Sequence, residues 1–269
     1  MLEWMLSRET KSRIWHAFYR MIPKRYYPHM IHDLERLAFV PLDYDKHEIL
    51  LAEGIRGQTC ANEPEVVTWM ETYLKPGQVF YDIGANVGAM SLIAAKFHQG
   101  KVKVYAFEPA ATTVLMLVQN ILRNNCEKSV IPVSFPLAKE VKVATFNYFR
   151  NLGVGGVGHT FGEAVTYDGD AFEPVYQQLM FSATIDDLVG KGYLPAPNHL
   201  KLDVDGLEPE ILAGGESVLK SPAVESVILE VGKRFDEKQV ITLLDRCEFD
   251  IVETYRHENS SNRLFGKRK

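Results

Sequence analysis

The sequence predicts an α/β fold in which a doubly wound, mostly parallel sheet is covered by helices on both faces. From about residue 62 onward, short apolar runs alternate with longer segments whose apolar residues recur at helical spacing. Several of these runs are continuously apolar, as in parallel strands that are buried on both faces. Strands and helices that alternate in this way are joined by right-handed crossovers, so a ligand is expected at the carboxyl ends of the strands.

The first half of this region contains alternating helices and strands. A helix is predicted over residues 62–74, with Asn62 as its N-cap and Glu65 in its first turn, and Pro76 and Gly77 end it. A strand over 78–85, a helix over 88–98, a strand over 101–109 and a helix over 112–125 follow. This alternation predicts the first strand–helix–strand crossovers of the sheet.

The second half is interrupted by a long loop. Strands are predicted over residues 129–140 and 141–149, and a loop rich in glycine and charge covers 151–174. Regular structure returns at 182–189, followed by a strand over 199–206, a helix over 208–220, a strand over 224–231 and a helix over 236–249. Strands over 250–257 and 262–268 end the pattern.

Composition excludes several classes of protein. The chain has 269 residues and a formal net charge of -5, which argues against a general nucleic-acid binder because such proteins need a basic face. No run approaches the roughly 18 apolar residues of a membrane-spanning helix. Cys60, Cys126 and Cys247 are widely spaced and form no CxxC pair, which favours reduced thiols and a cytoplasmic location.

Residues 1–60 are predicted to form a largely helical extension that precedes a main domain over 61–269. This segment mixes aromatic residues with Arg and Lys at near-helical spacing. One interpretation is a helix that packs on the main domain or on a second subunit, which would give a homo-oligomer. The other is a helix that lies on a membrane surface.

The stretch "FYDIGANVGAM", residues 80–90, follows a predicted strand and indicates a ligand-binding turn. A dinucleotide turn requires G-x-G-x-x-G, and the second glycine here is in the wrong place for it. A P-loop requires a Lys and a Ser or Thr after its last glycine, and both are absent. The third candidate is the turn that binds S-adenosyl-L-methionine, written (acid)-x-G-x-x-x-G.

Asp82, Gly84 and Gly88 fit this third pattern. An acid in the turn can hold the ligand's amino group, the helix N-terminus favours its carboxylate, and glycines let the backbone approach its methionine part. Glu108 ends the next predicted strand, where an acid accepts hydrogen bonds from ribose hydroxyls in doubly wound folds. The alternative, in which the glycines only form a tight turn and the acids cap helices, stays open.

Four segments together resemble the FkbM family of S-adenosylmethionine-dependent methyltransferases: "FYDIGANVGAMSLIAA", "VYAFEPAATTVLMLVQNILRNN", "TIDDLV" and "HLKLDVDGLEPEILAGGESVL" followed by "VILEV". The resemblance implies a class I, Rossmann-like sheet of seven strands with the last one antiparallel, and O-methylation of sugars, glycolipids or polyketide-type metabolites. It assigns Asp82, Gly84, Asn86 and Gly88 to the cofactor turn and Glu108 to the ribose. Asn124 matches a recurrent family position without an assigned role, and "DVDG" departs from the commoner D-V-E-G.

Candidate catalytic residues follow the later strands. In "KLDVDGLE", strand alternation would place Lys201, Asp203 and Asp205 on one side. The two aspartates are predicted to act on the acceptor, with one as general base, or to bind a divalent cation through oxygen ligands. Alternatively, Asp205 caps the following helix and Asp203 makes a structural hydrogen bond. No histidine or cysteine has metal-ligand spacing, so no metal site is predicted.

Two further residues are predicted to face the acceptor. Glu230 ends the strand "VESVILEV" and points toward the site by analogy with the fold, or else forms an ion pair with a nearby base. His159 lies in the glycine-rich loop, which is long enough to cover the acceptor, and is either a general base or a solvated loop residue.

These observations and the resemblance together predict a methyltransferase that acts on a hydroxyl of a saccharide, glycolipid or other small metabolite. Other interpretations are a methyltransferase on an amine, protein or nucleic acid, a non-catalytic S-adenosylmethionine-binding module, and an NAD-dependent oxidoreductase. The N-P-P-[YF] signature of base and amide N-methylation is absent.

Overall fold

The computed structural model describes residues 39–52, 58–150, 155–166, 168–231, 237–257 and 260–268. The predicted helices of residues 1–38, and the subunit contact assigned to them, lie outside the described residues. Val40–Lys269 form one compact unit. The domain boundary expected after residue 60 stays a prediction.

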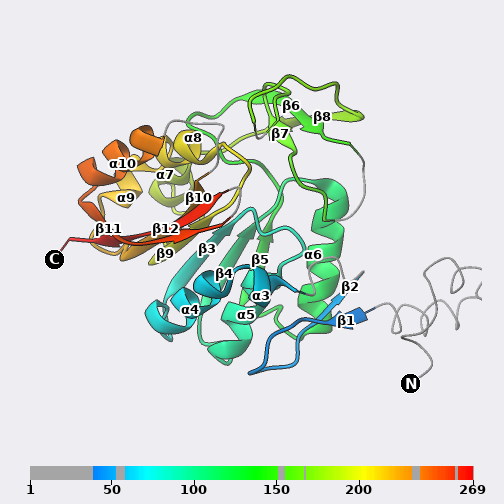
Figure 1. Ribbon diagram of the computed structural model, residues 1–269, viewed down its shortest axis with the longest axis vertical. Coiled ribbons are helices and arrows are strands. Elements are labelled where there is room, and N and C mark those ends of the chain that lie inside the picture. Colours follow the sequence, from blue (N-terminus) through cyan, green and yellow to red (C-terminus); the bar gives the residue numbers. More distant parts are fainter. Residues whose placement is uncertain are drawn as a thin grey trace, which may run out of the picture. The chain divides into compact units, whose positions relative to one another are not determined.

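A central sheet of seven strands organises the described part of the chain (Figure 1). The strands are β3 (Val79–Ile83), β4 (Lys103–Phe107), β5 (Val130–Val133), β9 (His199–Leu202), β10 (Ser226–Val231), β11 (Phe249–Arg256) and β12 (Ser261–Lys267). Their order is β11-β12-β10-β9-β3-β4-β5, and β12 is antiparallel to both of its neighbours. The pairs from β10 through β5 are parallel. This confirms the doubly wound, mostly parallel fold.

Helices cover both faces of this sheet (Figure 1). One face packs against α4 (Pro64–Tyr73), α5 (Ala89–Phe97) and α6 (Ala111–Arg123), and the other against α7 (Ile185–Gly190), α8 (Glu208–Ala213), α9 (Glu216–Leu219) and α10 (Glu237–Arg246). Each set of helices forms its own apolar cluster with the sheet. In the part of the chain that the structure describes, no helix is long and apolar enough to cross a membrane.

The start of the first predicted helix was wrong. Asn62 ends a short helix, α3 (Thr59–Asn62), and α4 begins at Pro64 with Glu63 as its N-cap residue and no side-chain capping bond. Proline suits the first turn of a helix because the amide hydrogen that it lacks has no partner there. The single predicted helix is therefore two helices, and the second begins at Pro64.

A short two-stranded sheet, β1 (Phe39–Pro41) and β2 (Leu50–Ala52), precedes these helices. The Asn124 side chain at the end of α6 holds β2 in place. Its Oδ1 accepts from Leu50 N at 3.0 Å, and its Nδ2 donates to Leu50 O at 2.8 Å. The structure therefore gives Asn124 a scaffold role that the sequence did not reveal.

Residues 143–181, called the insert below, contain a third, antiparallel sheet that the sequence did not predict. Its strands are β6 (Val143–Tyr148), β7 (Thr160–Phe161) and β8 (Tyr176–Phe181), in the order β7-β6-β8, and it lies at the top of Figure 1. The strand expected over 141–149 exists, but it pairs within this insert because Phe146 and Tyr148 belong to a separate apolar cluster. The expected strand over 129–140 shortens to β5.

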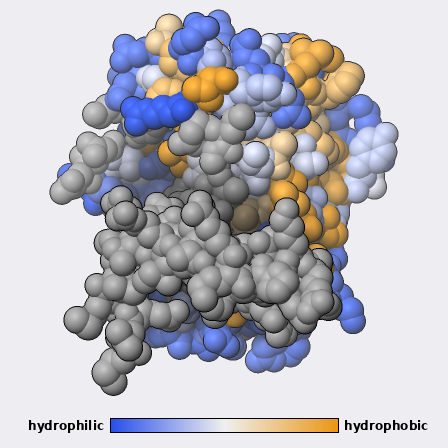
Figure 2. Space-filling view, turned by 90° about the vertical axis from the view of Figure 1, so that its right-hand side faces the viewer, coloured by the Kyte–Doolittle hydropathy of each residue, from blue (hydrophilic) through white to orange (hydrophobic). Residues whose placement is uncertain are grey.

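Large apolar side chains are exposed on the insert and on helix α6. Leu179 and Phe181 are exposed on β8, and Leu115 and Leu122 are exposed on α6. Both elements lie on the side of the molecule that Figure 2 faces, where hydrophobic side chains gather beside polar ones.

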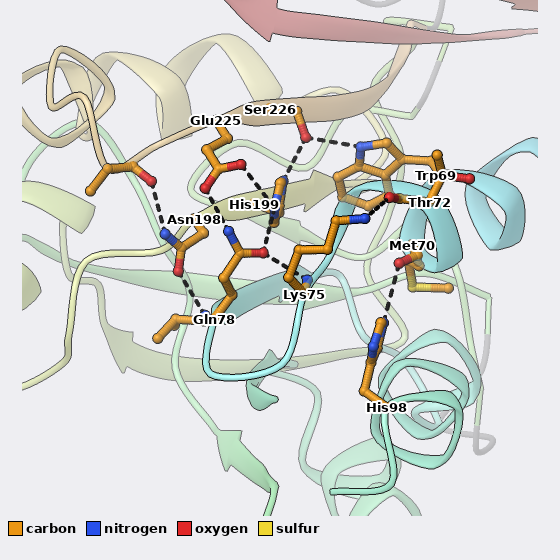
Figure 3. A network of polar contacts seen from close by, with 12 residues as sticks. Trp69, Met70, Thr72, Lys75, Gln78, His98, Asn198, His199, Glu225 and Ser226 are labelled. Carbon is orange, nitrogen blue, oxygen red and sulfur yellow. Dashed lines mark hydrogen bonds and ion pairs between the residues drawn. The ribbon is translucent and has the colours of Figure 1, made fainter. Parts of the chain in front are cut away.

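A buried polar network joins the amino ends of the central strands (Figure 3). Trp69 Nε1 donates to Ser226 Oγ at 2.9 Å, Ser226 Oγ lies 2.7 Å from His199 Nδ1, and His199 Nε2 lies 3.1 Å from Gln78 Oε1. Because the Gln78 amide oxygen only accepts, His199 Nε2 carries the ring proton, and the Ser226 hydroxyl donates to Nδ1. Burial lowers the pKa of His199 to about 4. The neutral network holds this end of the sheet together and leaves the carboxyl ends for a ligand.

Candidate active site

A cavity of about 480 Å³ lies where β3, β4, β9 and β10 end, and its size is within the usual range of small-molecule sites. Every predicted site residue except Gly88 lines it: Asp82, Gly84, Asn86, Glu108, His159, Asp203, Asp205 and Glu230. The carboxyl ends of four parallel strands therefore bring together four separate stretches of the sequence, and residues 155–166 add His159 as a fifth.

Two glycines shape the turn after β3. Gly84 has a φ of 83°, and a Cβ built on it would lie 1.9 Å from the backbone oxygen of Asp203. Gly88 is the N-cap residue of α5 with a φ of 91°, and its Cβ would lie 2.5 Å from Leu117 Cδ1. Both positions need the left-handed backbone that glycine adopts readily, and at Gly84 a side chain would also overlap backbone atoms. The turn can therefore pack directly on the loop after β9 and on α6.

Asn86 and Glu108 stabilise the same turn. Asn86 has a φ of 50°, which Asn tolerates better than most residues. Its backbone amide donates to Glu108 Oε2 at 3.1 Å, and Ala110 N donates to Glu108 Oε1 at 2.8 Å. The Asn86 side chain also donates to Gly156 O in the insert, at 3.4 Å. Glu108 thus fixes the turn from the end of β4 while it lines the cavity.

Asp82 is buried beneath the turn. Its Oδ2 accepts from Ser91 Oγ at 2.6 Å, whereas its buried Oδ1 has no hydrogen-bond partner among the described residues. Burial raises the pKa of Asp82, and the positive charge of Lys201 and the Ser91 hydrogen bond oppose this effect. A buried carboxylate oxygen without a donor is costly. A cationic donor at this edge of the cavity would satisfy it.

Lys201 is a buried cation between carboxylates. Its Nζ lies 2.9 Å from Asp203 Oδ2, and only 5% of the residue is exposed. Burial lowers the pKa of Lys201, but Asp203, Asp82 and Glu63 outweigh that effect and raise it above the ordinary range. The lysine therefore stays charged and stabilises the ionised forms of Asp82 and Asp203.

The acids after β9 converge through a loop rather than through strand alternation. β9 ends at Leu202, so Asp203 and Asp205 follow the strand, and Asp205 has a φ of 56°. Asp205 Oδ2 accepts from Gly158 N of the insert at 2.7 Å. The N-cap residue of α8 is Leu207 rather than Asp205.

Glu230 completes an acidic group with these two residues. Its side chain shares a hydrogen bond with Asp203 and lies near Ser260, and its pKa is raised to about 7 by burial first and by Asp203 second. Two hydrogen-bonded carboxyl groups share a proton more readily than both ionise. Because Lys201 favours the ionised form of Asp203, Glu230 is the member that keeps the proton.

His159 lines the cavity beside the aromatic residues of the insert. Phe149 N donates to its Nδ1 at 3.0 Å, so the neutral ring carries its proton on Nε2. That Nε2 is buried and has no hydrogen-bond partner within the described ranges. Burial lowers the pKa of His159. These contacts favour His159 as a hydrogen-bond donor to a ligand. Its role as a general base stays a prediction.

Comparison with known proteins assigns this arrangement to a family. The family model described as the methyltransferase FkbM domain matches residues 82–255, from the acid of the turn into β11. The chain belongs to the FkbM methyltransferase family. It is therefore a methyltransferase.

Two relatives and one solved structure show how far the similarity of this FkbM domain extends. The chain is 27% identical over 214 residues to hexuronic acid methyltransferase AglP from Haloferax volcanii, covering 79% of each protein. It is 29% identical over 177 residues to 31-O-demethyl-FK506 methyltransferase FkbM from Streptomyces tacrolimicus, covering 59% of this chain and 66% of the relative. The crystal structure of methyltransferase FkbM from Methylobacillus flagellatus has a TM-score of 0.50 at 16% identity, over 74% of this chain and 47% of that one.

The cavity is also lined by residues outside the family match that the sequence did not indicate. His257, Ser260 and Asn262 line the cavity from the end of the β11–β12 hairpin, and Glu63 lines it from the start of α4. The predicted strands over 250–257 and 262–268 implied a hairpin, but its position depends on β12 lying between β10 and β11. Of the sequence observations, only the antiparallel last strand implied by the family resemblance indicates where this hairpin lies.

Metal binding has no support from the residues that the structure describes. Within the described ranges, no group of three or more His, Cys, Asp or Glu side chains is arranged to hold a metal ion. Asp203 instead pairs with Lys201, and Asp205 accepts from a backbone amide.

Proposed function

We propose that this FkbM methyltransferase transfers a methyl group from S-adenosyl-L-methionine to a hydroxyl of a saccharide, glycolipid or other small metabolite. The observation that carries the proposal is the cavity, which joins the Asp82–Gly88 turn to the hydrogen-bonded carboxyl groups of Asp203 and Glu230. A cofactor turn and an acceptor site that share one cavity suit the transfer of a small group between two ligands.

The residues of the turn fit the cofactor. The buried, unpartnered Oδ1 of Asp82 suits the ammonium of its methionine part, and Gly84 and Gly88 leave room for close approach of the backbone. Glu108 at the end of β4 is placed to accept from ribose hydroxyls while it holds the turn. When bound, S-adenosylmethionine supplies a methyl group on positively charged sulfur.

The acceptor side is suited to a hydroxyl group. Asp203, kept ionised by Lys201, accepts a hydrogen bond, and the proton of Glu230 is held between the two carboxyl groups. His159 Nε2 supplies a donor from the insert. Donors and acceptors arranged in this way match the paired donor and acceptor character of a polyol. Asp203, Asp205, Glu230 and His159 are accordingly the residues proposed to bind and orient the acceptor.

The names of the relatives support an oxygen acceptor. The Haloferax protein is named for a hexuronic acid, and the Streptomyces protein for a 31-O-demethyl compound. For the present chain, the acceptor class, the cytoplasmic location and the homo-oligomer all belong to the proposal. A non-catalytic cofactor-binding module and a methyltransferase on an amine or protein acceptor are the competing functions.

Transfer of label tests the proposal. The protein is incubated with methyl-labelled S-adenosylmethionine and with fractions of saccharides, glycolipids and small metabolites, and the labelled product is analysed by mass spectrometry. We expect the label in a methyl ether. Saturable cofactor binding without label in any fraction would indicate a binding module, and label on nitrogen would indicate an amine acceptor.

A further inference from the structure

A histidine and a buried glutamate form a pair at the edge of the cavity. His257 follows β11, and its Nε2 lies 2.8 Å from Oε1 of Glu65, in the first turn of α4. The Glu65 side chain is only 6% exposed, whereas the His257 side chain is 33% exposed and lines the cavity. Asn262 Nδ2 donates to the same Glu65 oxygen at 2.7 Å. The carboxylate is thus fixed from two directions.

This contact determines which nitrogen of the neutral histidine carries the proton. A carboxylate accepts, so Nε2 must donate to Glu65 and Nδ1 keeps its lone pair. His257 Nδ1 makes no hydrogen bond within the described ranges. His159 has the opposite arrangement, because a backbone amide already occupies its Nδ1. Of these two cavity histidines, His257 is therefore the one that presents a free acceptor nitrogen.

The hairpin turn places His257 beside the acidic pair. His257 N donates to Ser260 O at 3.0 Å, and Ser260 and Asp203 both lie close enough to Glu230 to influence its pKa. In the next strand, Asn262 pairs in register with Glu230. The Asp203–Glu230 pair and His257 therefore line the same cavity, linked through the backbone of β12.

We propose that His257 is the catalytic base that accepts the proton of the acceptor hydroxyl, with Glu65 and Asn262 as its positioning residues. This inference rests on the proposed methyl transfer to a hydroxyl. The acceptor oxygen forms a bond to the methyl carbon, the carbon–sulfur bond breaks with its electron pair on sulfur, and the hydroxyl proton passes to His257 Nδ1. The negative charge of Glu65 then stabilises the imidazolium, and Asp203 and Glu230 orient the acceptor.

Three variants distinguish a catalytic base at residue 257 from a histidine that only stabilises the structure. His257→Gln keeps a donor that reaches Glu65 but removes the basic nitrogen, so kcat is expected to fall about 100-fold, as is typical when a general base is lost. KM and the calorimetric affinity for S-adenosylmethionine should stay near the wild-type values. His257→Ala should lose a similar factor and recover part of it with added imidazole, which a purely structural residue would not do. His47→Gln, outside the cavity, is the matched control.

A measurement without turnover accompanies the kinetics. Nitrogen-15 NMR of the histidine rings in the full chain should show His257 as the Nε2–H tautomer, and Glu65→Gln should shift its signals. The proposal is overturned by an Nδ1–H tautomer, by a His257→Gln variant that keeps kcat within about threefold of wild type, or by His257→Ala without imidazole rescue. A wild-type enzyme that methylates nothing contradicts the proposed function instead, and in that case the tautomer still decides whether the pair is built as described.

Discussion

Gly84 lies so close to Asp203 that any side chain at residue 84 would overlap the Asp203 backbone. A Cβ on Gly84 would be 1.9 Å from Asp203 O and 2.9 Å from its carbonyl carbon. The turn proposed to hold the cofactor therefore packs directly on the loop that carries the acceptor-side acids. The two halves of the site are built as one unit.

Gly84→Ala is expected to disrupt that unit. The left-handed backbone costs a non-glycine residue about 1 kcal/mol, and the overlap with backbone atoms adds to it, so the total loss should exceed about 3 kcal/mol. Gly100→Ala is the matched control, since Gly100 has a φ of 72° with nothing within 4 Å of its Cβ. Thermal denaturation should show a much larger loss for residue 84. Equal losses would contradict the packing argument.

Asn124→Ala should weaken the fold without altering the cofactor site. The substitution leaves both backbone groups of Leu50 without their side-chain partner, which typically costs about 2–3 kcal/mol. Chemical denaturation should show this loss, while calorimetry gives an unchanged affinity for S-adenosylmethionine. Gln119→Ala, on the exposed side of the same helix, is the control. A loss of cofactor affinity in Asn124→Ala at full stability would assign this residue to the site.

Stability should fall as the pH rises toward mildly alkaline values because of Glu208. Burial first, and then Asp203 and Asp205, raise the pKa of Glu208 from 4.5 to about 8, and Oε2 has no partner among the described residues. A raised folded-state pKa means that the stability contributed by the protonated form is complete below 4.5 and is lost as the pH rises through about 8. The melting temperature should therefore decrease as the pH rises from 4.5 to about 8.

Glu208→Gln tests this assignment. The amide keeps an acceptor for Val204 N and cannot ionise, so the melting temperature of the variant should depend less on pH over that interval. Glu210→Gln, on the same helix with its side chain 44% exposed, should behave like the wild type. If all three proteins lose stability in parallel, another group is responsible.

The sequence predicted the central sheet because burial on both faces requires continuous apolar strands, as in "QVFYDIGA" and "VESVILEV". It predicted the residues after β3, β4, β9 and β10 for the same reason, since parallel strands end at one edge. The insert was missed because β6 alternates around an apolar cluster of its own, which includes Phe146 and Tyr148. Local spacing does not reveal which sheet a strand joins.

The His257–Glu65 contact could not be predicted from the sequence, for a similar reason. The two residues are 192 positions apart, and they meet only because β12 inserts between β10 and β11. The tautomer of His159 likewise depends on an amide ten positions away in the folded insert. Residue type and spacing identify candidates, whereas hydrogen-bond direction assigns donors and acceptors.

The turn from Asp82 to Gly88 is proposed to hold S-adenosylmethionine at the cavity shared with the acceptor-side acids. Titration calorimetry of the wild-type protein and of Asp82→Asn tests it most directly, with NAD as the competing cofactor. We predict saturable binding of S-adenosylmethionine by the wild type, at least tenfold weaker binding by Asp82→Asn because a charge-assisted hydrogen bond to the ammonium is lost, and no binding of NAD. Equal affinity of the two proteins for S-adenosylmethionine, or preferential binding of NAD, would contradict the account.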